Sequence, residues 1–248
     1  MPPGWIIQAP SACVLFIGDE MRISALLMRS LTHTEHAQPI LEFVARLAPR
    51  FGDRKASAAA RRLAGEAPFL EDWARELRES DYAVLNAHSL VSIWGAVETC
   101  VEDLAVSVFL NWPHALPALQ LIGVKHSLQF PPSEEQAHAL YGKLERRMAA
   151  PGDIVETYAG VLGHLELDAP VSASDAAILR EVNALRNCLL HRGGRIDARA
   201  VQAAPTLAGQ EGSAVRVSSA DYLRYHEAVS AWVVALLSSA TQSKYFPR

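Results

Sequence analysis

Four polar residues near position 190 have the types and the spacing that phosphodiester chemistry requires. Asn183, Asn187 and His191 follow one another at intervals of four residues. Successive residues of an α-helix are rotated by about 100°, so a helix through this stretch places all three side chains on one face. Arg186 lies between that face and the apolar side of the helix. The stretch therefore predicts a surface with one permanent cation, one imidazole and two amides.

These side chains suit the cleavage of RNA without a metal ion. A guanidinium holds a phosphate through two N–H donors and offsets charge that develops in the transition state. An imidazole moves a proton near neutral pH, and the free carbonyls at a helix end favour its cationic form. The 2′-hydroxyl of RNA then serves as the nucleophile, and the product is a cyclic phosphate. We expect Arg186 and His191 to carry this chemistry.

A purely structural interpretation of the same residues stands beside the catalytic one. In that interpretation the helix simply ends near His191, whose ring caps the last carbonyls, and Arg186 is paired with a carboxylate. An Arg five residues before a His arises often by chance in an Arg-rich chain, although none of the other eight histidines has one. Spacing alone favours the structural interpretation.

A family resemblance favours catalysis instead. The string Arg186-Asn187-x-x-x-His191 resembles the Arg-x-x-x-x-His motif of the HEPN superfamily, including the polar residue that commonly follows the Arg. The longer string RNCLLHRGGRID also resembles the motif region of several HEPN families. Residues 92–104 resemble their long preceding helix, in which an aromatic and an acidic residue recur, and residues 215–221 fit the loop and helix that follow.

The resemblance covers roughly residues 80–240 and implies an all-α HEPN-like helical bundle that forms a homodimer. In such a dimer, two motif helices meet across a cleft. It implies a metal-independent endoribonuclease, acting as a toxin or an antiviral-defence effector, with RNA as substrate and an antitoxin or defence protein as partner. It implies no cofactor and no metal. Arg186 would hold phosphate, His191 would be the general acid/base or its orienter, and Asn187 would position the 2′-hydroxyl or the phosphate.

One position departs from a HEPN pattern. Some members carry a Tyr two residues after the His, which a partner nucleotidyltransferase modifies, but Gly193 stands there in this chain. That variant is therefore not supported. Other members of the superfamily are inactive, so a catalytically inactive helical dimer that binds a protein partner or a nucleotide is the main alternative. A purely structural helical subunit is the third hypothesis.

Further residues are candidates for supporting roles. Arg192 and Arg195 flank the motif and, together with Asn183, are candidates for binding RNA phosphates. Glu98 and Glu102 lie in the long helix that precedes the motif, where they can face the cleft and tune His191. A surface or structural role is favoured for both glutamates.

Two strongly periodic segments are expected to position these residues. The segment 81–111 has apolar residues every three or four positions, which indicates a helix that faces a core or a partner. These are Ala87, Leu90, Trp94, Val97, Val101, Leu104 and Val108. A second helix, capped by Ser174 or Asp175, is expected to run through His191 with Ile178, Val182, Leu185 and Leu189 inward. Gly193-Gly194 supplies its stop.

The remaining segments are expected to be mostly helical as well. Residues 1–18 are predicted to be irregular, with a short strand at 13–17. Pro39 is predicted to divide residues 19–48 into two helices, and Pro68 to divide residues 54–80 into two amphipathic pieces. Residues 113–132 are predicted to form a loop.

The C-terminal half carries three further helix signals. Ser133 and Gln136 form a capping box, and Asp153 caps a short helix to Leu162. A final helix opens at Ser219 or Asp221 and runs to Ser239, with Leu223, Val229, Trp232, Val233 and Leu236 inward. Residues 195–217 are predicted to be a loop with a short strand at 215–217.

Composition and charge fit this organisation. The chain has 248 residues, half of them apolar and a fifth charged, which is a globular composition. The sequence predicts an all-α protein with an N-terminal helical extension at 1–80 and a HEPN-like helical domain at 81–248. Three widely spaced cysteines without metal-ligand spacing favour a reduced, cytoplasmic protein. No segment is long and apolar enough to suggest a membrane span, and the net charge of −4 requires no general nucleic-acid surface.

Overall fold

The computed structural model describes residues 4–112 and 130–246, and the protein is all-α over these ranges. The elements are η1 (Trp5–Ile7), α1 (Gln8–Thr34), α2 (Ala37–Leu47), η2 (Ala48–Phe51), α3 (Arg54–Glu79), α4 (Ala83–Asn111), α6 (Glu134–Met148), α7 (Ile154–His164), α8 (Ala173–His191), α9 (Ala198–Ala203), η4 (Pro205–Leu207) and α10 (Ser219–Gln242). None of the described helices is long and apolar enough to cross a membrane.

Helix α4 forms the centre of the bundle. All seven residues of its predicted stripe are buried, and Trp94 is completely inaccessible. The prediction of a long core helix at 81–111 is therefore confirmed. A helix that is apolar on most of its surface must be surrounded by others, and α4 contacts α1, α6, α8 and α10. Every helix of the candidate site packs directly or indirectly on this one.

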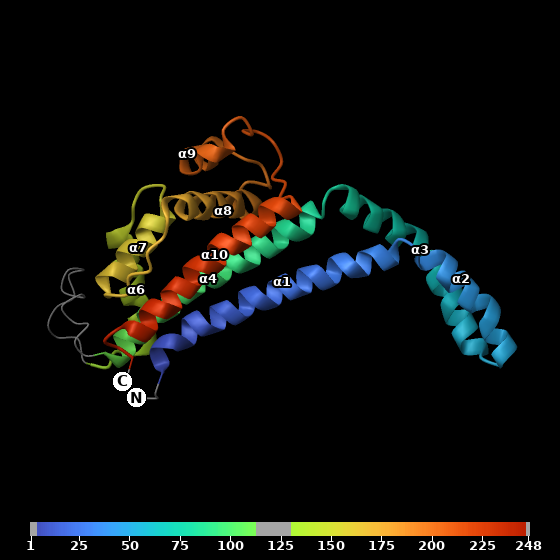
Figure 1. Ribbon diagram of the computed structural model, residues 1–248, viewed down its shortest axis with the longest axis horizontal. Helices are drawn as coiled ribbons and strands as arrows, with labels where there is room; N and C mark the ends of the chain where they lie inside the picture. Colours follow the sequence, from blue (N-terminus) through green and yellow to red (C-terminus); the bar gives the residue numbers. More distant parts are fainter. Residues whose placement is uncertain (1–3, 113–129, 247–248) are drawn as a thin grey trace.

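The bundle has three layers in the view of Figure 1. Helices α4 and α10 form the middle layer, α1 lies on one side of it and α8 with α9 on the other. The last helix is amphipathic as predicted, since Val229, Trp232, Val233 and Leu236 are buried. The inward assignment of Leu223 is wrong, because its side chain is 48% exposed. The layers place α8 at an outer surface, where a polar face can meet solvent.

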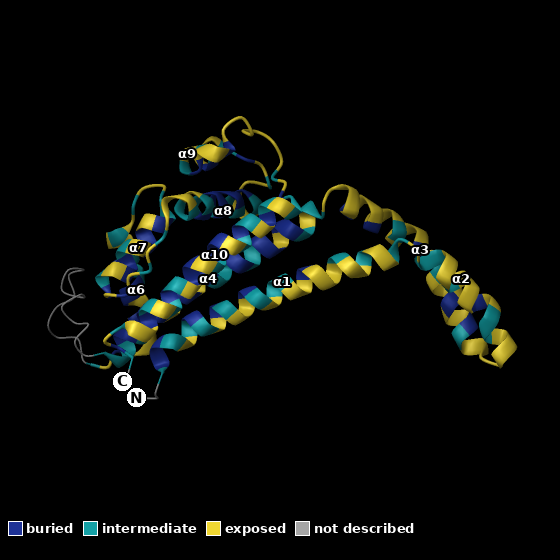
Figure 2. Ribbon diagram, in the orientation of Figure 1, coloured by how far each residue is buried: buried dark blue, intermediate teal, exposed yellow. Residues whose placement is uncertain are grey.

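Helices α2 and α3 form a hairpin that projects from the bundle (Figure 1). Their side-by-side packing is anchored by Gln38, whose backbone N–H donates to the Glu71 carboxylate at 2.6 Å. Ser57 donates to the carbonyl of Ala45 at 2.9 Å. We call residues 35–80 the arm. Figure 2 shows that most of its surface is exposed.

The extension predicted at residues 1–80 is divided between the bundle and the arm. Helix α1 packs along α4 and α10, and Ile6, Cys13 and Ile17 are part of the same buried core. The domain boundary at residue 80 stays a prediction. Within the predicted extension, only the arm projects from the bundle.

Two predictions for the N-terminal region are wrong. Residues 13–17 form no strand but lie in α1, which begins at Gln8. Pro10 falls in the first turn, where its missing N–H has no helical partner to lose. Pro68 does not divide residues 54–80, because α3 continues through it. The Ala-rich flanks and the contact with α2 maintain the helix, and α3 changes direction along its length in Figure 1.

The C-terminal boundaries differ from the sequence expectation by a few residues. Ser172, and not Ser174 or Asp175, caps α8, and Ser218 caps α10, which extends to Gln242. The predicted loop 195–217 contains α9 and η4, and residues 215–217 form no strand. A single β-bridge joins Arg195 to Ala214 instead.

Two of the predicted helix starts are confirmed. Ser133 and Gln136 form a reciprocal capping box at the start of α6. Asp153 caps α7 by accepting from the backbone N–H of Glu156. Most of the loop predicted at 113–132 falls outside the described residues.

Candidate functional site

The C-terminal end of α8 is fixed by two glycines. Gly193 and Gly194 have φ angles of +59° and +70°, a region that other residues enter only with strain. The N–H groups of Arg192 and Gly194 both donate to the carbonyl of Cys188, at 3.1 and 3.0 Å. The helix therefore ends at His191, as the sequence predicts, and the chain turns back over the polar face of α8.

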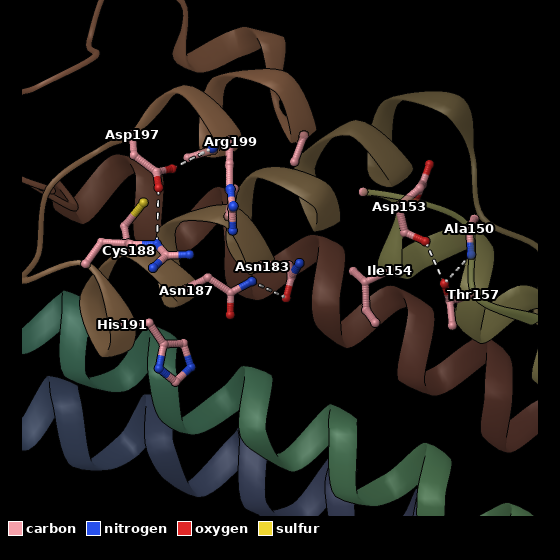
Figure 3. A pocket seen from close by; sticks show the side chains of 15 residues that line it. Ala150, Asp153, Ile154, Thr157, Asn183, Asn187, Cys188, His191, Asp197 and Arg199 are labelled. Atoms are coloured by element: carbon pink, nitrogen blue, oxygen red, sulfur yellow. Dashed lines mark hydrogen bonds and ion pairs between the residues drawn. The ribbon is translucent and has the colours of Figure 1, made fainter. Parts of the chain in front are cut away.

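That polar face lines a pocket of about 620 Å³ between α8, α9 and the start of α7 (Figure 3). Asn183, Asn187 and His191 all line it, so the three residues spaced by four do share one surface. The opposite wall carries Asp153 and Thr157 from the start of α7, together with Arg199 from α9. The pocket is therefore built by three successive helices within residues 150–203, with α7 and α9 placed against the polar face of α8.

The imidazole of His191 is exposed. It makes no hydrogen bond with any residue of 4–112 or 130–246. It does not cap the carbonyls of α8, which the structural interpretation expected of it. Figure 3 shows the ring at the opposite end of the pocket from Asp153 and Thr157. A ring in this position can exchange a proton with a ligand in the pocket.

Arg186 lies behind the pocket and is not part of its lining. Its Nη2 donates to the carboxylate of Glu98 on α4 at 2.5 Å, and its Nη1 donates to Oδ1 of Asn187 at 3.0 Å. The side chain is 20% exposed. Its Nε is buried and has no hydrogen-bond partner among the described residues. Arg186 thus reaches the pocket through Asn187, and direct contact with a phosphate requires the ion pair with Glu98 to open.

The contact with Arg186 also fixes the orientation of the two amides. Asn187 accepts from Arg186 through Oδ1, so its Nδ2 donates to Oδ1 of Asn183, at 3.4 Å. The chain of contacts from Glu98 through Arg186 to Asn187 and Asn183 orders one wall of the pocket. Within the described residues, the amide N–H groups of Asn183 donate to no partner, so they can donate to a ligand.

The two glutamates of α4 have partners other than His191. Burial raises the pKa of Glu98, and the nearby charge of Arg186 opposes this rise without cancelling it. Glu102 pairs with Nδ1 of His138 on α6 at 2.7 Å. Within the described part of the chain, neither carboxylate bonds to His191. Their tuning of His191 stays a prediction, whereas Glu98 has an evident structural role.

The arginines around the pocket differ in whether their guanidinium groups already have partners. Arg192 lines the pocket and pairs with Asp197 at 3.2 Å. Arg195 lies outside the lining and donates to the carbonyl of Gly212 at 2.8 Å. Arg199 lines the pocket and forms no ion pair within residues 4–112 and 130–246. The arginine with the freest guanidinium is thus one that the sequence did not single out.

Sequence reasoning missed Arg199 because residues 195–217 carry no helical periodicity. One local signal was present, since Asp197 stands three residues before Ala200 and caps α9 by accepting from its N–H at 2.9 Å. A second pocket of about 570 Å³ shares Asp153 and Arg199 with the first and extends to Arg180. Arg180 pairs with Asp153 at 2.6 Å. The two pockets adjoin along α8 and α9.

The pocket can bind an anion and hydrogen-bond to it. Both of its acidic residues are occupied as helix caps and as partners of Arg180 and Arg192. Its uncommitted groups are a guanidinium, an imidazole and amide N–H donors, all of which favour a phosphate. No group of three or more His, Cys, Asp or Glu side chains within the described residues is arranged to hold a metal ion.

Comparisons of the chain with protein families, with curated proteins and with solved structures find no match.

Proposed function

We propose that the chain is a metal-independent endoribonuclease of HEPN type, with its cleavage site at the pocket on α8. In the reaction, the 2′-hydroxyl of RNA loses its proton and attacks the adjacent phosphorus atom. The bond from phosphorus to the 5′-oxygen breaks, and the leaving oxygen takes up a proton. The products are a 2′,3′-cyclic phosphate and a 5′-hydroxyl.

One observation carries the proposal. The exposed ring of His191 shares a pocket with two amides and with the guanidinium of Arg199, which has no carboxylate partner among the described residues. An unpaired cation and a proton-transfer group beside the same cavity are what phosphodiester cleavage without a metal requires. A helix end with a purely structural role has no need of either group in a pocket.

The residues then have distinct roles. His191 transfers the proton, Arg199 and Arg192 bind the phosphate, and Asn187 with Asn183 orients the phosphate or the 2′-hydroxyl. Arg186 is a positioning residue that orders Asn187 while it is paired with Glu98.

A second candidate function is a catalytically inactive module that binds a nucleotide or a protein. The ion pair between Arg186 and Glu98 favours it, because it withdraws the motif arginine from the pocket. This alternative keeps the anion-binding pocket but assigns no proton transfer to His191. It therefore predicts binding that survives replacement of His191.

The test is cleavage of total RNA and of tRNA in EDTA by the wild-type chain, His191→Ala and His33→Ala. His33 is exposed on α1, which lies on the opposite side of the middle layer from α8 in Figure 1, and it is the matched control. We expect His191→Ala to lower the cleavage rate at least about a hundredfold, with a cyclic phosphate on the wild-type product. His33→Ala should cleave like the wild type.

Stability measurements complete this test. His191 is exposed and unbonded, so its replacement should change the free energy of unfolding by less than about 0.5 kcal/mol. Equal cleavage by wild type and His191→Ala would refute the proposed site. Phosphate or nucleotide binding without any cleavage, lost in Arg199→Ala but kept in His191→Ala, would establish the binding module instead.

The proposed activity also predicts an effect on cell growth. A ribonuclease of this kind is a toxin or a defence effector that acts on cytoplasmic RNA under the control of a partner protein. Induced expression of the wild-type chain should then arrest growth, whereas His191→Ala at the same level should not. Growth arrest by both proteins would contradict an RNA-cleaving origin of the toxicity.

A further inference from the structure

The arm has its large apolar side chains on the outside. Six arm residues are buried, and five of them are small: Ala45, Ser57, Ala60, Ala67 and Ala74. These small residues let α2 and α3 approach closely. Leu77 is the one large residue among them. The hairpin is therefore held together by small side chains and by the hydrogen bonds of Gln38 and Ser57.

The exposed apolar side chains of the described residues are concentrated on the arm and on α1. Seventeen large apolar side chains are exposed in all, and thirteen of them lie on these elements. Eight are on the arm: Ile40, Phe43, Val44, Phe51, Leu63, Phe69, Leu70 and Trp73. Five are on α1: Leu15, Phe16, Ile23, Leu26 and Leu27. Scattered exposed apolar residues are normal, but a concentration of this kind marks an interaction surface.

The total surface of the chain is large enough to include a stable interface. The chain exposes 13998 Å², whereas a compact monomer of 27.0 kDa exposes about 10,800 Å². The difference is about 3,200 Å², and each partner of a permanent dimer buries about 1,000–2,500 Å². The excess of surface over a compact chain is therefore as large as the area that a stable dimer buries.

The charge of the arm argues against an anionic partner. Residues 35–80 contain eight Arg or Lys and eight Asp or Glu residues, so the arm has no net charge. Anionic lipids and nucleic acids are recognised by an excess of basic residues, and the arm has none. A surface with both signs and a large apolar area can be complementary to a second copy of itself.

We propose that the arm and the second half of α1 form a self-association surface, on which the arm of a second copy of this chain packs. Phe69, Leu70 and Trp73, close together on α3, are the central anchors. Large aromatic side chains dominate the binding energy of interfaces. Figure 1 places α1 and α8 on opposite sides of the middle layer, so this surface does not cover the pocket on α8. The proposal is independent of the ribonuclease function.

The experiment is sedimentation of the full chain over a range of concentrations. We expect the mass of two chains for the wild type and for the matched control Val234→Glu, which places a charge at a similarly exposed apolar position on α10. Phe69→Glu combined with Trp73→Glu should weaken the dimer at least about thirtyfold, with unchanged helical circular dichroism. His191→Ala should remain dimeric, which separates this surface from the candidate site.

Hydrogen exchange of the wild type at two concentrations tests the same surface without a variant. Amides of α2 and α3 should gain protection at the higher concentration, while those of α10 should not. A wild-type monomer at every soluble concentration would overturn the proposal, as would a dimer that the arm variant leaves intact. Binding of the wild type to anionic vesicles that the arm variant loses would assign the surface to lipid and overturn it as well.

Discussion

At the scale of single residues, the ion pair between Arg186 and Glu98 determines how the motif arginine can act. Both side chains are less than one-third exposed, so their interaction is stronger than that of a surface pair. Arg186 also donates to Asn187, which couples the pair to the pocket. Loss of Arg186 therefore removes both a structural contact and an ordered amide.

A double-mutant cycle measures this interaction. Arg186→Ala leaves the Glu98 carboxylate partly buried and unpaired, so we expect a loss of about 2–3 kcal/mol of unfolding free energy. With Glu98→Ala added, the further loss should be small, giving a coupling energy above about 1 kcal/mol. The exposed pair of Arg75 with Asp72 is the control, with an expected coupling below about 0.5 kcal/mol. Equal couplings would mean that Arg186 is not held by Glu98.

The carboxyl group of Glu181 should make the free energy of unfolding depend on pH. Burial raises the pKa of this carboxyl, but hydrogen bonds from Arg224, Tyr225 and Thr206 more than offset the burial, and the net pKa is lowered. A lowered pKa means that the folded state favours the carboxylate. The stabilisation is then fully present above the usual glutamate pKa of about 4.3 and is lost as the pH falls through the lower folded value.

Urea unfolding of the wild type and of Glu181→Gln tests this sign. At pH 7 the variant should be less stable by about 2–3 kcal/mol, because it weakens a buried charged network. The difference between the two proteins should shrink as the pH is lowered below about 4. A difference that grows in acid would reverse the assignment of the carboxylate form.

At the scale of elements, replacement by alanine should have opposite effects on stability at two glycines. Gly194 ends α8 with a φ of +70°, and a Cβ there meets no atom within 4 Å. Gly194→Ala should therefore destabilise by about 1 kcal/mol through backbone strain alone. Gly65 lies inside α3 with the same open space around it. Gly65→Ala should stabilise by about 0.5–1 kcal/mol.

Thermal unfolding of the two variants checks this pair. Opposite shifts of the melting temperature are expected, and a downward shift for both would mean that the space around Gly65 is used by a partner. Such a result would be informative for the arm, since Gly65 stands between Leu63 and Phe69 on α3.

At the scale of the whole molecule, the C-terminal segment closes the bundle against its N-terminal segment. The ring of Tyr245 lies 6.1 Å from that of Trp5 and 5.3 Å from that of Trp112. Its hydroxyl donates to the carbonyl of Leu165 at 2.8 Å. One side chain therefore links the ends of α4, α7 and α10 with the segment before α1.

Two substitutions at Tyr245 separate packing from hydrogen bonding. Tyr245→Ala should lower the free energy of unfolding by about 3 kcal/mol, because a buried aromatic ring is removed. Tyr245→Phe keeps the ring and should lower it by about 1 kcal/mol. Chemical denaturation measures both values. Equal losses for the two variants would mean that the rings contribute nothing to closure.

The sequence by itself determined the helices whose signals are local. Burial of α4 follows from its apolar stripe, and the starts of α6 and α7 follow from capping side chains within one turn. The common face of Asn183, Asn187 and His191 follows from helical geometry alone. These features depend on residues at most a few turns apart, so a single sequence contains all the necessary information.

Only the tertiary structure decided the contacts made across the fold. Arg186 is withdrawn from the pocket by Glu98, which lies 88 residues earlier in the chain. Arg199 enters the pocket because a short, non-periodic helix turns back over α8. The continuity of α3 through Pro68 and the outward apolar face of the arm depend on packing. In each case the outcome is a balance of burial and pairing between distant residues, and no local pattern encodes that balance.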